Sequence, residues 1–167
     1  MSRAGSERMS MTPSSVGEQE YLTFTLGQEH YGVDILKVQE IRGWEPLREM
    51  HDVPPCIKGV LDFRGRIIPI IDLRIRFGVE PVEYLSTTVV IVLSRGDGDM
   101  MGVVVDAVSD VLSIHGDAIK PPPRLGTHIG NDYVTGMVSL EQGMVMLIDA
   151  ERLIHPDELE AAERQAV

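Results

Sequence analysis

Histidine, cysteine and aspartate side chains are the residues of this sequence that could hold a metal ion, and their spacing does not favour it. The five histidines show no His-x-x-x-His spacing, and the single Cys56 has no second thiol with which to build a thiolate site. Asp97-Gly98-Asp99 has the opening spacing of a calcium loop, but the twelfth position, which needs a glutamate, is Val108. We therefore expect no metal site and no cofactor.

Motifs for nucleotide binding and nucleophilic catalysis are also missing. Neither Gly-x-x-x-x-Gly-Lys nor Gly-x-Gly-x-x-Gly occurs, and Gly-x-Ser-x-Gly is absent. Cys56 follows two prolines, with no helix start to lower its pKa. Asp106 and Asp110 could pair for acid–base work, but this needs a desolvating pocket, and a solvated loop is the simpler interpretation. The sequence predicts a protein that is not an enzyme.

The elements that would position any site are short strands. In Tyr21–Leu26 apolar and polar residues alternate, which predicts a strand with one buried face, and Tyr31–Val33 completes a hairpin. Asp34 can cap a helical turn, and the next segment, Val38–Arg42, fits either that helix or a strand; we favour the strand. Further hairpins are predicted at Ile57–Phe63 with Ile67–Leu73, Thr87–Leu93 with Met101–Val105, and Tyr133–Leu140 with Met144–Ile148, and Val108–Ile114 extends the β region.

Proline, glycine and capping residues divide these strands. Pro69 lacks an amide donor and predicts an edge strand or a bulge. Asp72 can cap a short helix over Leu73–Phe77 that Gly78 ends. A loop is expected at Leu125–Asp132, and helical segments at Asp149–Ile154 and Pro156–Ala166. Eight to ten short strands indicate a mainly β fold, either a barrel or a sandwich.

Composition and charge narrow the partners and the compartment. Of the 167 residues 43% are hydrophobic, enough for a folded core, while the net charge of −11 repels phosphate backbones and anionic lipid headgroups. We expect no nucleic-acid partner and no membrane insertion. The N-terminal stretch has no apolar signal segment, and one cysteine needs no oxidising environment, so a cytoplasmic protein is expected.

Several motifs, in order along the chain, resemble the CheW family of chemotaxis coupling proteins. They are the segments 31–43, 57–60, 64–65, 68–74, 88–93 and 102–112. The resemblance implies two small five-stranded β-barrels that share an apolar core, with short helices. It also implies an adaptor between methyl-accepting chemoreceptors and the C-terminal regulatory domain of the histidine kinase CheA. We expect a flexible tail over residues 1–19, this domain over 20–155, and a helix-prone tail over 156–167.

Family positions that carry function are matched by seven residues, which we expect to bind partners: Val38, Glu40, Ile41, Gly59, Arg64, Gly65 and Val89. Glu40 and Arg64 could form a charged pair, or each could be an ordinary surface charge. The three apolar residues could line a groove for a receptor helix hairpin, or could be core. The two glycines are expected to serve backbone geometry at a bulge or a positive φ.

One departure from the family pattern concerns the central hairpin. The family commonly has Asn-Leu-Arg-Gly there, and this chain has Asp62-Phe63-Arg64-Gly65, which replaces an amide by a carboxylate that can only accept hydrogen bonds. Two alternatives stay open at this point. One is a coupling protein for a CheA-like system outside swimming chemotaxis, and the other is a barrel that binds a small ligand between its halves.

Overall fold

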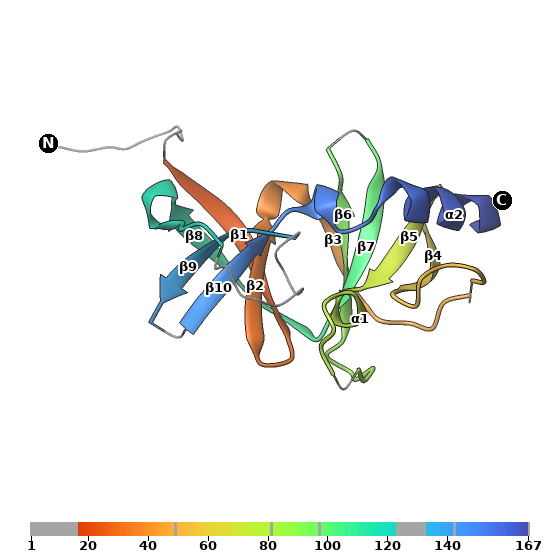
Figure 1. The fold of residues 1–167 in the computed structure, drawn as a ribbon, viewed down its shortest axis with the longest axis horizontal. Coiled ribbons are helices and arrows are strands. Elements are labelled where there is room, and N and C mark those ends of the chain that lie inside the picture. The colour runs from red at the N-terminus through yellow and green to blue at the C-terminus, as the bar shows by residue number, and fades with distance from the viewer. Residues whose placement is uncertain are drawn as a thin grey trace, which may run out of the picture.

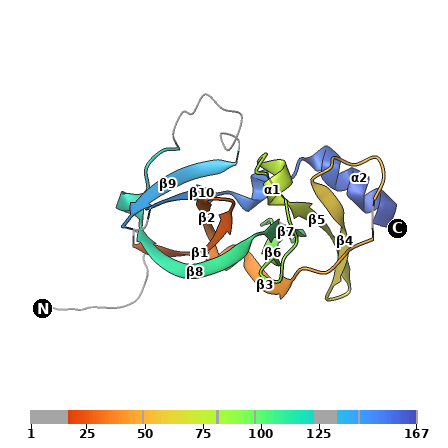
Figure 2. The same cartoon turned by 90° about the horizontal axis from the view of Figure 1, so that it is seen from below.

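The computed structural model of the protein describes residues 17–166, with the exception of 49, 81, 97, 123–132 and 142. Residues 1–16 of the expected tail and the expected loop at Leu125–Asp132 therefore lie outside the described residues. The described residues form two five-stranded sheets that lie next to each other along the long axis of the molecule (Figure 1). The view turned by 90° shows the same separation, with β1, β2, β8, β9 and β10 on one side and the other five strands, together with α2, on the other (Figure 2).

The first sheet combines the first two and the last three strands of the chain. Its spatial order is β8-β1-β2-β10-β9. All neighbours are antiparallel except β2 and β10, which are parallel. The strands are β1 (Glu18–Leu26), β2 (Glu29–Asp34), β8 (Ala107–His115), β9 (Val134–Leu140) and β10 (Gly143–Ile148).

The second sheet is built from the middle of the chain. Its order is β3-β6-β7-β5-β4, and again one pair, β5 and β7, is parallel. The strands are β3 (Val38–Gly43), β4 (Ile57–Phe63), β5 (Arg66–Asp72), β6 (Val89–Ser94) and β7 (Met100–Val105). In both sheets an antiparallel three-stranded unit is joined in parallel to a hairpin, so the two halves follow one plan.

Aspartates begin three of the short helices, as their sequence positions suggest. Their carboxylates accept hydrogen bonds from backbone N–H groups two residues later. The capped elements are η1 (Ile35–Lys37) after Asp34, α1 (Leu73–Arg76) after Asp72, and η3 (Ala150–Arg152) after Asp149. The remaining helices are η2 (Gly116–Ala118) and α2 (Pro156–Ala166), which contacts β5 and β4 of the second sheet.

Three apolar clusters hold this arrangement together. The largest draws buried residues from both sheets, among them Phe24 and Tyr31 from the first and Ile91 and Leu93 from the second. Two smaller clusters belong to one sheet each, around Val138 in the first and Val92 in the second. Successive residues of β6 alternate between the shared cluster and the cluster of their own sheet, as a strand buried on both faces requires. The mainly β fold with a shared core is confirmed.

The prediction of an edge strand at Pro69 is wrong. Strand β5 lies between β7 and β4 inside the second sheet. The proline is tolerated because the parallel pairing with β7 begins one residue later, at Ile70, so the missing amide falls outside that ladder. A bulge does occur nearby, but on the partner strand, between Ile57 and Gly59.

Candidate protein-binding site

Strand β3 is an edge of the second sheet and carries three of the seven predicted binding residues. A register shift against β6 lies between Val38 and Glu40. On one face, Val38 pairs with Leu93 and Ile41 pairs with Ile91, both residues of the shared core. On the other face, Glu40 pairs with Val92, which lies in the second sheet's own cluster. Edge strand β3 therefore has an apolar face and a charged face.

The three predicted apolar residues lie on the first of these faces. Val89 is two residues from Ile91 on β6, and both Val89 and Val38 are partly buried against the shared core. Ile41 has 43% of its surface exposed. Leu36, in the preceding turn η1, is 79% exposed. The core alternative therefore describes Val38 and Val89 in part but does not describe Ile41, whose side chain extends the apolar face to solvent.

The charged pair predicted between Glu40 and Arg64 is not formed. Glu40 instead pairs with Arg42, two residues along the same face, with 3.4 Å between Oε2 and Nη1. Arg64 lies in the β4–β5 turn with a φ of 53°, and its guanidinium lies 4.6 Å from the centre of the Phe63 ring. Among the described residues, no ion pair involves Arg64, so this cation is available to a partner.

The central hairpin explains the chain's departure from the family pattern. The Asp62 carboxylate accepts a hydrogen bond from the Gly65 N–H at 3.1 Å, and Gly65 has a φ of 81°. The side-chain oxygen of an asparagine could accept the same hydrogen bond from that N–H, so the turn does not depend on the amide nitrogen. Phe63 is buried in the second sheet's own cluster. Both substituted residues therefore serve the hairpin itself.

Gly59 lies at the β4 bulge and has a φ of 150°. A Cβ atom there would meet the Arg48 carbonyl oxygen at 2.5 Å and the Leu47 Cβ at 2.9 Å. Gly59 thus allows the loop after β3 to lie against β4. Gly65, by contrast, has open space around the same position. Both glycines have the positive φ that was expected, but only Gly59 is also required by close packing.

A buried guanidinium, which the sequence reasoning missed, belongs to Arg74 in α1, directly after β5 of the second sheet. Arg74 is 1% exposed and makes a two-point ion pair with Asp72, with distances of 2.9 Å from Nε to Oδ1 and 2.8 Å from Nη2 to Oδ2. Its Nη1 donates to the Glu83 carbonyl at 2.6 Å and to Asp106 Oδ1 at 2.9 Å. The Tyr84 phenol donates to Asp72 Oδ2 at 2.8 Å and packs its ring on the guanidinium.

Titration behaviour follows from this network. Burial alone would lower the pKa of the Arg74 guanidinium, but the hydrogen bonds and charges of Asp72 and Asp106 outweigh it and raise the pKa above its ordinary value. Burial, and then the hydrogen bond and charge of Asp72, also raise the pKa of the Tyr84 phenol. Both groups keep their neutral-pH protonation state. Neither the Asp106–Asp110 pair nor a solvated loop describes Asp106, whose partner is Arg74.

The space between the two sheets bears on the alternative of a barrel that binds a ligand between its halves. The shared core occupies the interior of this space, and an open cavity of about 560 Å³ at its margin is lined by Thr25 and Gly27 of the first half, Glu83 and Thr88 of the second, and Asp106. No group of three or more His, Cys, Asp or Glu side chains that could hold a metal ion is found among the described residues. None of the described helices is long and apolar enough to cross a membrane.

Two sequence signals could have indicated the Arg74 network. Asp72 and Arg74 flank the start of a helix in a segment whose other residues are apolar, and a charge inside such a segment needs a buried partner. Asp106 follows directly on the apolar strand Met101–Val105. The distance of 32 positions between Arg74 and Asp106 is what hid their contact, because no local pattern links them.

Comparisons with known proteins agree with this geometry. Residues 20–158 match the model of the CheW-like domain. The chain is 44% identical over 163 residues to the "Chemotaxis protein CheW" of Klebsiella aerogenes, covering 98% of both chains. It is 35% identical to the "Probable chemotaxis protein CheW" of Rhizobium etli, covering 87% of this chain and 94% of the relative.

A solved structure resembles the whole described fold. The crystal structure of the scaffolding protein TtCheW from Thermoanaerobacter tengcongensis superimposes with a TM-score of 0.77 at 30% sequence identity, covering 84% of this chain and 95% of that one. A full-length relative, a family model and a common fold therefore point the same way. The chain belongs to the CheW family of chemotaxis coupling proteins.

Proposed function

We propose that the chain is a non-catalytic bridge that binds the C-terminal regulatory domain of a CheA-type histidine kinase on one surface and the cytoplasmic tip of methyl-accepting chemoreceptors on another. The observation that carries this proposal is the two-faced edge strand β3, with apolar Ile41 on one side and charged Glu40 on the other. One small rigid body with two different surfaces can tie the position of the kinase to the conformation of the receptor.

The apolar face suits the receptor. Helices are recognised by grooves through apolar side chains spaced along one helix face. One face of the β3–β6 pair carries Val38, Ile41 and Val89 at the margin of the shared core. These side chains form an apolar surface that is continuous with the packed core. The receptor tip would add its own apolar anchors to this surface.

The charged side suits the kinase domain. Arg64 lies exposed in the β4–β5 turn with no ion pair to any residue that the structure describes, and the Glu40–Arg42 pair is partly exposed, with both side chains at 37%. Charged groups at the rim of an interface select the partner and orient it more than they add affinity. We propose that the complementary charges belong to the regulatory domain of the kinase.

This function sets the location and excludes catalysis. The chain would remain in the cytoplasm and would reach the membrane only by binding receptor arrays. Its effect on phosphorylation would come from positioning the kinase, with no chemical step performed by its own side chains.

Reconstitution tests the proposal directly. Receptor tips in membranes or nanodiscs are mixed with a CheA-type kinase, and autophosphorylation is measured with and without this chain. We expect receptor-dependent stimulation only when the chain is present, and loss of stimulation with Arg64→Glu. No stimulation with any receptor and kinase pair from the same organism would overturn the proposal.

A further inference from the structure

The chain crosses between the two sheets three times, and an aspartate lies at each crossing. Asp34 is the last residue of β2, Asp106 lies between β7 and β8, and Asp149 lies between β10 and η3. Asp34 and Asp149 cap the short helices of their own crossings, and Asp34 also accepts from Gln19 Nε2 on the neighbouring strand of the same half. Asp106 instead makes long-range bonds, to Arg74 and to Gly27.

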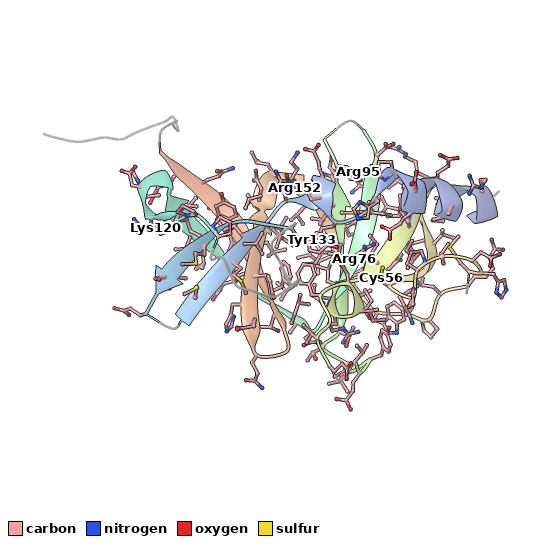
Figure 3. The ribbon with its side chains drawn as sticks, in the orientation of Figure 1. Cys56, Arg76, Arg95, Lys120, Tyr133 and Arg152 are labelled. Atoms are coloured by element: carbon pink, nitrogen blue, oxygen red, sulfur yellow. The ribbon has the colours of Figure 1, made fainter. Side chains whose placement is uncertain are left out.

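The crossings are not evenly distributed around the junction. The first and the third lie together, because the tip of the β6–β7 hairpin at Gly96 approaches Lys37 Nζ and Glu151 Oε2 equally, at 3.3 Å from an ideal Cβ. Figure 1 shows η1 in orange and η3 in blue at the upper side of the junction, while the β7–β8 link passes along the lower side. Figure 3 labels Arg152 of η3 and Arg95 of the β6–β7 hairpin near one another at that upper side.

Asp106 joins both halves at the side away from η1 and η3. Its Oδ1 accepts from Arg74 Nη1 at 2.9 Å, in the second half. Its Oδ2 accepts from the Gly27 N–H at 2.7 Å, and its own N–H donates to the Thr25 carbonyl at 3.1 Å, both in the β1–β2 hairpin of the first half. One carboxylate thus connects the first hairpin to a guanidinium that is itself fixed by Asp72.

The shared core alone does not set the angle between the halves as sharply. Apolar contact is non-directional and depends on area, whereas hydrogen bonds have preferred lengths and angles. The Arg74–Asp106 pair is buried on the arginine side and partly exposed on the aspartate side, and ion pairs of this kind add little net stability compared with apolar packing but select one arrangement in some proteins. Two crossings lie on one side of the junction, and on the other side the one-residue β7–β8 crossing at Asp106 itself carries the polar link, so the link restrains this crossing as a hinge.

We infer that the Arg74–Asp106 link, fastened to the Gly27 turn, fixes the relative orientation of the two halves, so that Arg74 and Asp106 are positioning residues for the bridge. This inference rests on the proposed function for its biological meaning. Without the link, each half keeps its fold and the shared core keeps them in contact. The angle between the two halves becomes variable, and so does the shape of the apolar face at Val89, which lies next to the junction.

Asp106→Ala is the most informative variant. Asp106 is 35% exposed, so its removal leaves the buried Asp72–Arg74 ion pair complete and does not strand an isolated charge. Asp106→Asn keeps an oxygen acceptor in the same place and should restore part of the link. Asp110→Ala is the matched control, because it makes the same change in charge four residues away, where the backbone N–H and C=O of Asp110 bond to the Thr23 hydroxyl and both bonds survive the substitution.

Amide residual dipolar couplings measure the orientation without any partner. Couplings are fitted separately to the first and the second sheet of the full chain. In the wild type and in Asp110→Ala, both fits should give one common alignment tensor. In Asp106→Ala each sheet should still fit its own structure while the two tensors diverge, with Asp106→Asn between these limits. A common tensor in Asp106→Ala would overturn the inference. If the couplings of a single sheet no longer fit its own structure in Asp106→Ala, that variant has lost its fold, and the comparison is made with Asp106→Asn, where a common tensor identical to that of the wild type would overturn the inference.

Kinase assays then connect orientation to function. Asp106→Ala should bind receptor tips and the kinase separately about as well as wild type, while receptor-dependent stimulation falls by about tenfold, within the range of ordinary coupling energies. The failure of the two proposals can be distinguished. If the wild-type chain gives no stimulation, the proposed bridging function is wrong. The dipolar couplings still test whether the Arg74–Asp106 link fixes the orientation of the two halves. If stimulation is intact with divergent tensors, orientation does not matter for coupling.

Discussion

The two sheets of this protein follow the same strand plan but differ at their edges. In the first sheet a bridge between Lys120 and Met137 joins the chain that follows β8 to β9, so the two edges are linked. In the second sheet the described residues contain no pairing between β3 and β4, and β3 keeps an open edge. The predicted binding residues all lie in the sheet with the open edge.

Charge divides the halves in the same way. The chain has 15 basic and 26 acidic residues in total, yet residues 37–76, which form much of the second sheet, contain eight basic and six acidic residues. The excess of negative charge therefore lies elsewhere. The lesson is that one architecture, used twice, can serve two purposes: the first sheet closes and completes the core, and the second leaves an edge, a cation and an apolar face, which we propose contact the partners.

The largest effect is expected for a substitution in the core that the two halves share, where it should lower the free energy of unfolding. Leu93 is fully buried in the shared cluster, and Leu93→Ala should lower the free energy of unfolding by about 2–5 kcal/mol. Because both sheets use this cluster, urea denaturation followed by circular dichroism and by the fluorescence of Trp44 should give one coincident transition. Val111→Ala, at a half-exposed position, is the control. Two separate transitions would contradict a common core.

The next largest effect is a difference in stability loss between alanine substitutions at the two glycines of the predicted site. Gly59→Ala places a Cβ against the Arg48 carbonyl, and should cost about 1–3 kcal/mol. Gly65→Ala meets open space and carries only the cost of a positive φ, about 1 kcal/mol. Thermal unfolding of both variants measures the difference. Equal losses would mean that packing at the β4 bulge is unimportant.

A smaller effect concerns acid and the C-terminal helix. Burial would raise the pKa of Glu158, but the His155 N–H and Arg76, at 2.6 Å, lower it below its ordinary value of 4.5. Because the folded pKa is the lower one, this contribution is complete at neutral pH and is lost as pH falls below about 4.5. Glu158→Gln should flatten the stability curve in that window, measured by urea denaturation from pH 3 to pH 7, roughly the interval that spans ordinary carboxylate titration. An unchanged pH dependence of the free energy of unfolding in Glu158→Gln would mean that the Glu158 carboxylate does not stabilise the contact of α2.

The smallest expected change in stability accompanies a large change in function. Arg64→Glu should leave the melting temperature nearly unchanged, since Arg64 is exposed and has no ion-pair partner among the described residues, and it should abolish kinase stimulation. Arg152→Glu, also on the surface but in the turn η3, makes the same charge reversal as a control. A large drop in melting temperature for Arg64→Glu would make this residue structural.

Local pattern was sufficient to predict much of the fold. Alternation in Tyr21–Leu26, the helix cap at Asp72 and the glycine-containing turns depend on neighbours along the chain, and they were confirmed. Strand β3 was ambiguous from the sequence, and its pairing with β6 decides it. Pro69 was misjudged because the start of a parallel ladder depends on the position of β7.

The candidate site was harder to predict than the fold. The exposure of Ile41 depends on β3 being an edge strand, which no single segment encodes. Glu40 pairs with Arg42 because side chains two apart share a strand face, a local rule that the expected pairing of Glu40 with Arg64 did not take into account. The Arg74–Asp106 contact joins residues far apart in the sequence and could only be found in three dimensions.

The way the chain returns to its first sheet has a consequence for synthesis on the ribosome. Strands β1 and β2 emerge first but must wait for β8, β9 and β10, whereas the second sheet, completed by β7, can pair as soon as residue 105 is available. During that interval its face of the shared core, including Ile91 and Leu93, has only the β1–β2 hairpin as a partner and lacks the residues that β10 and η3 supply. We expect nascent chains that end between β7 and β10 to be those that most need chaperones, and the first half of the protein to be the last to fold.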